Sequence, residues 1–387
     1  MGEGLIIIGG GTGEARTIDR EYQSFLKLDG RTCLEIVLDE ATKTDNSYPI
    51  FLWGPEARLR ETLSPILKRE ENRREIHIVP EKFSPIDSLI FTCLESSRRT
   101  GKDSKSIRSP LEHVMPSRST AQRTVAAQNE PRNYIFYLSS DIPLVCHEEI
   151  DFFIKNADRD YDLLMGWSLR GGLETALKSF QNDQGNIDTS TTKINFSRFI
   201  VDGQPVEARF NNLYCGRPLR IDPHLYIFFH QIYKNRNLIK QTYRRGKVRK
   251  KIDRPDFLRL MKAFVRYVQT RKREGGTRVV AYGYRILNTH LHSLGLEGKN
   301  YRYLSALTRL LRGIEKKSPS FYLDKNIIEE NILKLTGNKI GMYLSNLIGP
   351  LLDIDGKNEY EFVKANFRRL RDGIDKYYTT CGMRKLP

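Results

Sequence analysis

The sequence predicts an α/β fold in which helices flank a Rossmann-like mixed β-sheet in three layers. Short apolar runs alternate with amphipathic helical segments along much of the chain, which is the pattern of layered α/β proteins. The first apolar run, residues 5–8, also leads directly into a glycine-rich segment at residues 9–13. Such a loop exposes backbone N–H groups to a ligand, and loops of this kind commonly bind phosphate.

The elements follow in order along the chain. We expect strands at residues 5–8, 49–53, 76–80, 134–138, 161–167 and 351–355, and a hairpin that turns at Asp202-Gly203. We expect helices at residues 34–41, 57–67, 84–94, 148–156 and 359–370. In the second of these helices Leu59, Leu63 and Leu67 recur every fourth residue, which gives one apolar face.

The length of the chain predicts more than one structural part. At 387 residues it exceeds the usual size of a single hydrophobic core, about 250–300 residues. We predict a core over residues 1–221, a basic helical insertion over 222–345, and a C-terminal strand and helix over 346–387 that complete the core. Residues 97–132 are rich in polar side chains and poor in large apolar ones, so we expect a mobile loop there.

The composition favours a cytoplasmic protein. No segment approaches the roughly 18 continuous apolar residues that a membrane-spanning helix needs. The N-terminus lacks the basic region and the small-residue cleavage site of a signal peptide. The five cysteines are scattered and form no C-x-x-C pair, which is typical of reduced thiols.

The net charge of +17 is concentrated in one segment. Residues 234–285 carry 18 Lys and Arg side chains against three acidic ones, and tyrosines are interleaved with them. Three interpretations stay open: a solvated basic face, a helix that lies on an anionic membrane surface, and, with less weight, a surface for nucleic acid. An apolar stripe from Phe257 to Val268 is equally compatible with packing on the core.

The spacing of the glycine loop excludes two common phosphate-binding motifs. The dinucleotide fingerprint needs glycines at positions i, i+2 and i+5, but Glu14 or Thr12 interrupts it in either register. The P-loop run of Gly, four residues and Gly-Lys-Ser/Thr is absent. What remains is an ordinary tight turn or another kind of phosphate loop, made by Gly9, Gly10, Gly11 and Gly13 and followed by the basic Arg16.

Acidic residues lie at two further predicted strand ends. Asp141 follows the strand at residues 134–138, and Asp353 and Asp355 follow the apolar residues 351–352. Carboxylates at the carboxyl edge of an open sheet lie where such sheets bind ligands, and together with phosphate oxygens they suit Mg²⁺. An Asx turn at Asp141 and a helix N-cap at the second pair are the alternatives.

The order of these motifs resembles the nucleotidyltransferases of the GT-A-like fold, among them molybdenum-cofactor guanylyltransferase. The matching motifs are the apolar strand with its glycine loop, the segment Lys27–Arg31, Asp141-Ile-Pro-Leu, and Asp353-Ile-Asp355 before the last helix. The resemblance covers residues 1–95, 133–215 and 346–372. This chain departs from the family pattern where Arg16 comes two residues later than usual and where Glu14 adds a negative charge.

The resemblance implies a role for each matching residue. The glycines Gly9, Gly10, Gly11 and Gly13 would line an NTP, and its base would be read near Pro80, Glu81 and Asp87. Arg16 and Lys27 would meet the phosphates and act in catalysis with Asp141. Asp141 and Asp355 would hold Mg²⁺, and Asn212 would lie near the acceptor.

The expected activity is therefore Mg²⁺-dependent transfer of NMP from an NTP to a phosphorylated small-molecule or lipid-linked acceptor, with release of pyrophosphate. One alternative is a glycosyltransferase of the same fold, although Ser139 occupies the position of the first carboxylate of its usual Asp-x-Asp motif. The other alternative is a non-catalytic protein that binds nucleotide or RNA on this scaffold.

Overall fold

The computed structural model describes residues 4–10, 17–71, 73–82, 88–89, 91–93, 95–96, 134–179, 196–221, 323–326, 329–330, 333 and 337–381. The chain divides into two compact units. Unit 1 contains residues 1–196, 206–220 and 340–387, and unit 2 contains residues 197–205 and 221–339. All residues of the site described below belong to unit 1.

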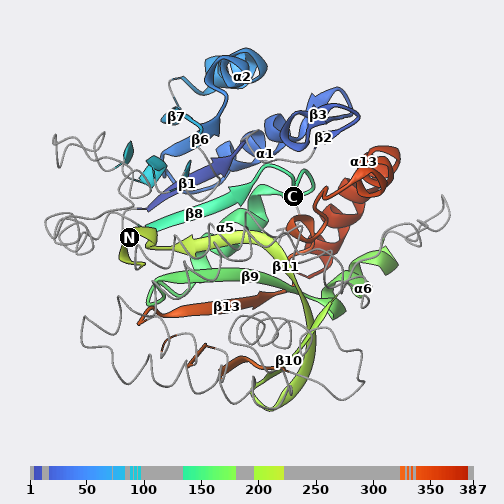
Figure 1. Cartoon of the computed structure of the whole chain (residues 1–387). Helices are drawn as coiled ribbons and strands as arrows, with labels where there is room; N and C mark the ends of the chain where they lie inside the picture. Colours follow the sequence, from blue (N-terminus) through green and yellow to red (C-terminus); the bar gives the residue numbers. More distant parts are fainter. Residues whose placement is uncertain are drawn as a thin grey trace, which may run out of the picture. The chain divides into compact units, whose positions relative to one another are not determined.

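Unit 1 is built on a mixed sheet (Figure 1). Its strands are β1 Gly4–Gly9, β6 Ile50–Gly54, β7 Ile76–Pro80, β8 Tyr134–Ser139, β9 Leu163–Leu169, β11 Gln204–Gly216 and β13 Ile340–Ser345, and they lie in the order β7-β6-β1-β8-β11-β9-β13. Strand β11, which belongs to this unit from Val206 onward, runs antiparallel to both of its neighbours, and the other pairs are parallel. This sheet, flanked by helices, confirms the predicted fold class.

The helices of unit 1 are α1 Cys33–Thr42, α2 Glu56–Glu70, α5 His147–Asn156, α6 Arg170–Ser179 and α13 Lys357–Thr380, with 3-10 turns η1 Gln23–Phe25, η3 Pro218–Arg220 and η4 Gly349–Leu351. Two small hairpins, β2 Thr17–Ile18 with β3 Glu21–Tyr22 and β4 Lys27–Leu28 with β5 Arg31–Thr32, precede α1. A capping box begins α1: the Thr32 hydroxyl accepts from the N–H of Glu35, whose carboxylate accepts from the N–H of Thr32.

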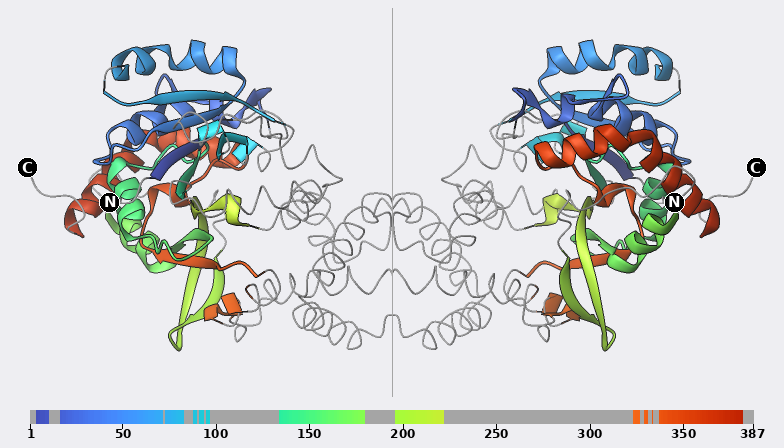
Figure 2. Two further views of the ribbon diagram at one scale, coloured as in Figure 1. Left: turned by 90° about the vertical axis from the view of Figure 1, so that its left-hand side faces the viewer. Right: turned by 90° about the vertical axis from the view of Figure 1, so that its right-hand side faces the viewer.

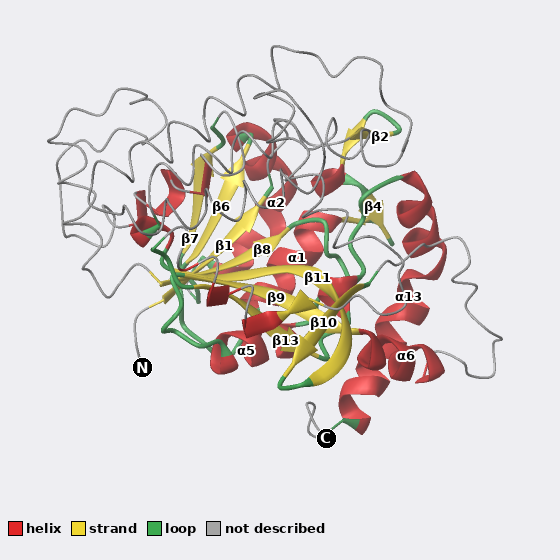
Figure 3. Cartoon of the chain, turned by 60° about the horizontal axis from the view of Figure 1, so that its bottom comes forward, coloured by secondary structure: helices red, strands yellow, loops and turns green. Residues whose placement is uncertain are grey.

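One face of the sheet carries the main hydrophobic core. Alternate side chains of the central strands, among them Ile6, Ile8, Leu52 and Phe136, pack with apolar residues of α1, α2 and α5. In the side views, α2 and β13 lie at opposite ends of the unit (Figure 2), as the strand order requires. A second apolar cluster joins α6 and α13, which lie side by side in Figure 3.

Two expectations about the C-terminal part were wrong. Residues 340–345 form strand β13 and not the end of a helical insertion, because Ile340 and Met342 are buried while parallel pairing with β9 satisfies the backbone. Residues 351–355 are not a strand: Gly349-Pro350 starts a short 3-10 turn, and the apolar Leu351 and Leu352 enter the second cluster. The predicted closing helix is present as α13 and is longer than expected.

Unit 2 is described only in part. It contains β10 Ser197–Val201 and β12 Leu323–Asp324, which pair in parallel. The turn at Asp202-Gly203 is present as predicted, with φ values of 50° and 75° that suit a tight hairpin turn. The expected loop at 97–132 and nearly all of the expected basic helical insertion lie outside the described residues. Within the described part, no helix is long and apolar enough to cross a bilayer.

Candidate functional site

Four parallel strands bring one row of residues to the carboxyl edge of the sheet. The strand registers pair Gly9 with Trp53 on one side and with Ser139 on the other, and Trp53 with Val79. Residues in register on neighbouring parallel strands point to the same face. Val79, Trp53, Gly9 and Ser139 therefore form one row across the sheet, at the edge where the loops of the site begin. We call this row the floor of the site.

Close packing requires glycine where β1 ends. A Cβ atom on Gly9 would collide with the Tyr137 hydroxyl and would lie 2.8 Å from Cζ2 of Trp53. A Cβ on Gly10 would lie 3.1 Å from Cδ2 of Leu34. The backbone at Gly9 and Gly10 therefore passes between large side chains, where only glycine fits. Gly11, Gly13 and Arg16 lie outside the described residues.

Asp141 directly follows the floor, two residues beyond Ser139. Its Oδ1 atom is buried and has no hydrogen-bond partner among the described residues. Burial raises the pKa of this carboxyl to about 7, and the charges of Asp353 and Asp355 add to the increase, while a hydrogen bond from Ser139 opposes it. A carboxylate with a buried, unpaired oxygen costs free energy, and a bound cation would remove that cost.

The structure brings Asp141 and the distant segment 353–355 together. The backbone N–H of Ile354 donates to the backbone oxygen of Asp141 over 2.9 Å. On its other side, the Gln23 side chain donates to the backbone oxygen of Ile354 over 2.6 Å. Asp355 is exposed. The two aspartates that the sequence predicts as metal ligands therefore lie on adjoining segments at one edge of the sheet.

Asp353 is held by two side chains from β11. Arg209 donates from Nη2 to its Oδ1 over 2.6 Å, and Asn212 donates from Nδ2 to its Oδ2 over 2.9 Å. Burial raises the pKa of Asp353 to about 6, although the charge of Arg209 opposes the increase. The pairing of β11 with β9 shifts register between Phe210 and Tyr214, and Asn212 has a φ of 60°.

This contact gives Asn212, predicted near the acceptor, a definite partner in the site. From the sequence, Asp353 was noticed only as the neighbour of Asp355, and no pattern pointed to Arg209. Because Arg209 and Asp353 are 144 residues apart, no local pattern could have linked them.

A buried carboxylate ties the two acidic segments together behind the site. Glu149 of α5 accepts hydrogen bonds from the N–H groups of Ile348 and Gly349 over 2.9 and 2.8 Å, and from the Tyr378 hydroxyl. Its other oxygen accepts from the N–H of Cys146 over 2.9 Å. Glu149 thereby joins the loop after Asp141 to the segment that leads to Asp353.

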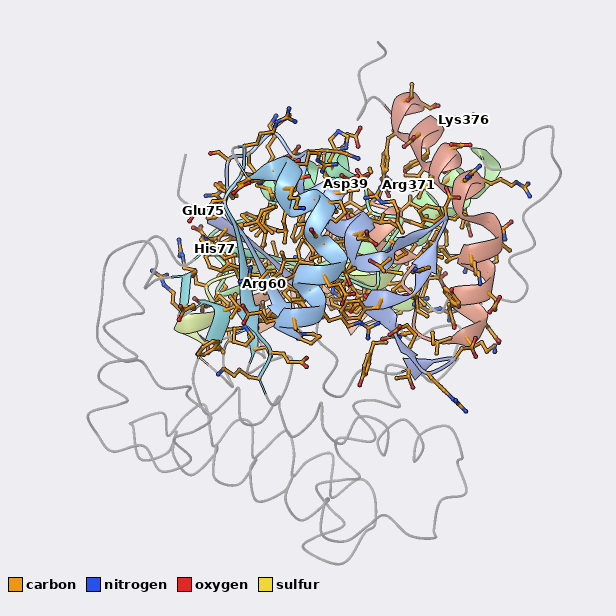
Figure 4. All side chains as sticks on the ribbon, turned by 90° about the horizontal axis from the view of Figure 1, so that it is seen from above. Asp39, Arg60, Glu75, His77, Arg371 and Lys376 are labelled. Atoms are coloured by element: carbon orange, nitrogen blue, oxygen red, sulfur yellow. The ribbon has the colours of Figure 1, made fainter. Side chains whose placement is uncertain are left out.

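An ion pair supports the same loop from α13. Arg371 donates from Nη1 to the backbone oxygen of Val145 over 2.7 Å and from Nη2 to Glu40 over 2.5 Å. Figure 4 shows Arg371 on α13 directed toward α1 near Asp39. His147 also hydrogen-bonds Glu40, which keeps the pKa of Glu40 below its usual range despite burial. His147 thus has a structural role as a partner of Glu40.

Of the remaining predicted residues, the structure describes Pro80, Glu81 and Lys27. Pro80 is exposed at the end of β7, and the N–H of Glu81 donates to the backbone oxygen of Gly54 over 3.1 Å. Asp87 lies outside the described residues. Lys27 is exposed on β4, and its backbone oxygen accepts from the Tyr360 hydroxyl of α13 over 3.0 Å.

The donor set can be tested against Mg²⁺. Among the described residues, no group of three or more His, Cys, Asp or Glu side chains could hold a metal ion by itself. Mg²⁺ does not need such a group, because it is usually bound through one or two carboxylates together with water and substrate phosphates. The unpaired Oδ1 of Asp141 and the neighbouring Asp355 fit this second kind of site.

Comparison with known proteins gives structural likenesses only. No protein-family model and no curated protein matches the chain. A hypothetical transferase from Thermus thermophilus is 14% identical, with a TM-score of 0.41, covering 94% of this chain and 100% of its own. A 4-diphosphocytidyl-2C-methyl-D-erythritol synthase from Anaerococcus prevotii is 10% identical, with a TM-score of 0.38 and coverages of 95% and 96%. A cytidylyltransferase from Leptospira borgpetersenii is 12% identical, with a TM-score of 0.35, and both chains are covered fully. Because these TM-scores are below 0.5, we base the function on the geometry of the site.

Proposed function

We propose that the chain is a Mg²⁺-dependent nucleotidyltransferase, which transfers NMP from an NTP to a phosphorylated acceptor and releases pyrophosphate. One observation carries the proposal. The carboxylate of Asp141 has a buried, unpaired oxygen and lies two residues beyond a strand end that is in register with Gly9. The backbone oxygen of Asp141 is hydrogen-bonded to Ile354, which stands between two further aspartates. A phosphate-rich ligand with a divalent cation satisfies both halves of this arrangement.

The glycine loop is proposed as the nucleotide site. Gly9 and Gly10 are buried, and a Cβ atom at either would meet the Tyr137 hydroxyl, the Trp53 ring or the Leu34 methyl groups, so packing within the protein already requires glycine there. Their backbone groups are proposed to begin the lining of the nucleotide. Gly11 and Gly13 would continue this lining. Pro80, Glu81 and Asp87 are proposed to contact the base at the adjacent strand end.

Asp141 and Asp355 are proposed as the residues that hold Mg²⁺. When bound, the ion would neutralise the charge that develops on the phosphate oxygens. Arg209 and Asn212 would keep Asp353 charged and fixed beside these ligands. Arg16 and Lys27 would supply further positive charge to the triphosphate.

The reaction needs no covalent intermediate with the protein. An oxygen of the acceptor phosphate would attack the α-phosphorus of the NTP in line, and the bond from that phosphorus to the bridging oxygen of the β-phosphate would break. The electron pair leaves with pyrophosphate, and the NMP unit is joined to the acceptor. Asn212 remains proposed on the acceptor side, and the acceptor is a small-molecule or lipid-linked phosphate. Contact of residues 234–285 with an anionic membrane and a cytoplasmic location also remain proposals.

The proposal is tested by thermal denaturation with each of the four NTPs, with and without Mg²⁺. We expect one NTP to stabilise the protein strongly in the presence of the metal, and Asp141→Asn to abolish the metal-dependent part. Equal, metal-independent stabilisation by all four would contradict the assignment. Release of pyrophosphate during turnover separates this activity from that of a glycosyltransferase, and NTP binding without turnover with any phosphorylated acceptor would favour a binding protein.

A further inference from the structure

Trp53, near the end of β6, has a buried donor with no acceptor. Its side chain is only 5% exposed, and Nε1 has no hydrogen-bond partner among the described residues. A buried indole N–H usually finds an acceptor, because an unmade hydrogen bond is costly in the protein interior. This tryptophan therefore resembles one half of an interaction that a ligand completes.

The N–H edge of the indole lies at Gly9, the last residue of β1. Cζ2 of Trp53 is 2.8 Å from the position that a Cβ of Gly9 would occupy. Cζ2 is bonded to Cε2, which is bonded to Nε1, so the donor is two covalent bonds from this contact. The Tyr137 hydroxyl approaches the same point of Gly9 from a neighbouring strand. Only a residue without a side chain lets both rings come this close.

The strand registers fix what lies on either side of Trp53. In the row across the sheet, Trp53 stands between Val79 and Gly9, and Ser139 follows Gly9. Beyond Val79 come Pro80 and Glu81, and two residues beyond Ser139 comes Asp141. Trp53 thus lies between the residues proposed to contact the base and the carboxylate proposed to hold the metal.

The two unpaired buried atoms of this edge complement each other. Nε1 of Trp53 is a donor and Oδ1 of Asp141 is an acceptor, and both lack a partner among the described residues. A nucleotide bound with a cation presents both what the donor needs, a carbonyl or phosphate oxygen, and what the carboxylate needs, a metal ion.

We propose that Trp53 is a nucleotide-contacting residue: its N–H donates a hydrogen bond to an oxygen of the bound NTP, which then lies at the edge of the indole ring. This inference rests on the proposed NTP site. It adds a side-chain donor from β6 to the proposed site.

The chain has only two tryptophans, which gives a direct measurement. The other, Trp167, lies on β9 against the Phe210 ring, with 5.8 Å between the ring centroids. In the variant Trp167→Phe all tryptophan fluorescence comes from Trp53. We expect its emission to change saturably on titration with the NTP and Mg²⁺, at the concentrations that stabilise the protein thermally. A stabilising NTP that leaves this emission unchanged would overturn the inference.

The variant Trp53→Phe then removes the N–H and keeps an aromatic ring. We expect the dissociation constant for the NTP to rise about tenfold. An unchanged constant in a variant that is folded by circular dichroism would overturn the inference, and the Trp167→Phe titration decides the matter if Trp53→Phe does not fold. If the unmodified protein binds no NTP, the proposed function itself fails, which is a different result.

A second experiment identifies which oxygen of the NTP accepts the hydrogen bond from Trp53. Inorganic tripolyphosphate with Mg²⁺ is titrated against the unmodified protein and against Trp53→Phe. Weakened binding of both tripolyphosphate and NTP supports an acceptor on the phosphates. Weakened binding of the NTP alone supports an acceptor on the base or ribose. Equal affinity of the two proteins for both ligands contradicts the proposal.

Discussion

Asp141 and Glu149 are acids eight residues apart with opposite surroundings: Glu149 is fully buried, whereas Asp141 is half-buried with one buried oxygen, Oδ1. Each has a pKa that burial raises. Glu149 accepts hydrogen bonds from three backbone N–H groups and from the Tyr378 hydroxyl. Asp141 has an oxygen with no partner among the described residues, and the charges of Asp353 and Asp355 raise its pKa further.

The difference separates an acid that holds the fold from one that is available to a ligand. Four donors around one carboxylate offset its loss of hydration, so removing Glu149 would leave those donors unpaired. Asp141 has a hydrogen bond from Ser139, but its Oδ1 has no partner among the described residues, and the cation proposed above would offset that cost. We therefore expect Glu149 to matter mainly for stability and Asp141 mainly for activity.

The largest effect is expected from Asp141→Asn. Loss of the carboxylate that would hold the metal should lower the rate of pyrophosphate release about a thousandfold, or about 4 kcal/mol of transition-state stabilisation. The free energy of unfolding in urea should stay the same or rise, because an unpaired buried charge is removed. If Asp141→Asn is active and less stable than the unmodified protein, the distinction between Asp141 as a residue for activity and Glu149 as a residue for stability is wrong.

Glu149→Ala should have the reverse profile. We expect it to lower the free energy of unfolding by about 3 kcal/mol, since three N–H groups and one hydroxyl lose their acceptor. Urea denaturation measures the loss, and Glu361→Ala, an exposed acid on α13, is the matched control with an expected change near zero. Unaltered stability in Glu149→Ala would mean that the hydrogen bonds of Glu149 do not hold the two segments together.

A smaller, pH-dependent effect is expected from His147→Gln. Hydrogen bonding to Glu40 raises the pKa of His147 above its ordinary value of 6.5, with help from the charge of Glu148 and against that of Lys43. The stability that charged His147 contributes is therefore fully present below pH 6.5 and is lost as pH rises through the raised value. The pKa of Glu40 is lowered from 4.5, so Glu40 remains charged there.

The stability difference between the unmodified protein and His147→Gln should accordingly be about 1 kcal/mol near pH 5.5 and should shrink near pH 8.5. Urea denaturation at the two pH values measures it. If the difference in unfolding free energy instead grows with pH, the neutral imidazole is the stabilising form. The charged His147–Glu40 pair would then not be the source of the stability.

The strands and helices with regular hydrophobic patterns could be predicted from the sequence. The leucines of α2 and the apolar run of β1 gave the right element at nearly the right residues, because burial on one face or on both leaves a local pattern. Strand β13 was missed because Gly341 and the half-buried Tyr343 interrupt its apolar run. Residues 351–355 were wrongly predicted as a strand, because two adjacent apolar residues such as Leu351 and Leu352 are equally expected in a buried strand and in a buried 3-10 turn.

The candidate site could be predicted only where each residue carries its own signal. Asp141 and Asp355 each follow an apolar run, so both were found, and the structure places their segments together. Arg209 is one of many arginines, and only the fold brings it to Asp353. The unpaired N–H of Trp53 was equally invisible, because a missing hydrogen bond depends on everything that surrounds the side chain.

The hydrogen bond between Ile354 and Asp141 also has a consequence for biosynthesis. It joins backbone positions that are 213 residues apart. At the usual pace of translation, roughly 5–20 residues per second, the second position follows the first by roughly 10–40 s. During that interval the nascent chain cannot bring Asp353 and Asp355 to Asp141. A chain that stops short of residue 346 would therefore lack Asp353 and Asp355, the two acids on the segment that is hydrogen-bonded to Asp141.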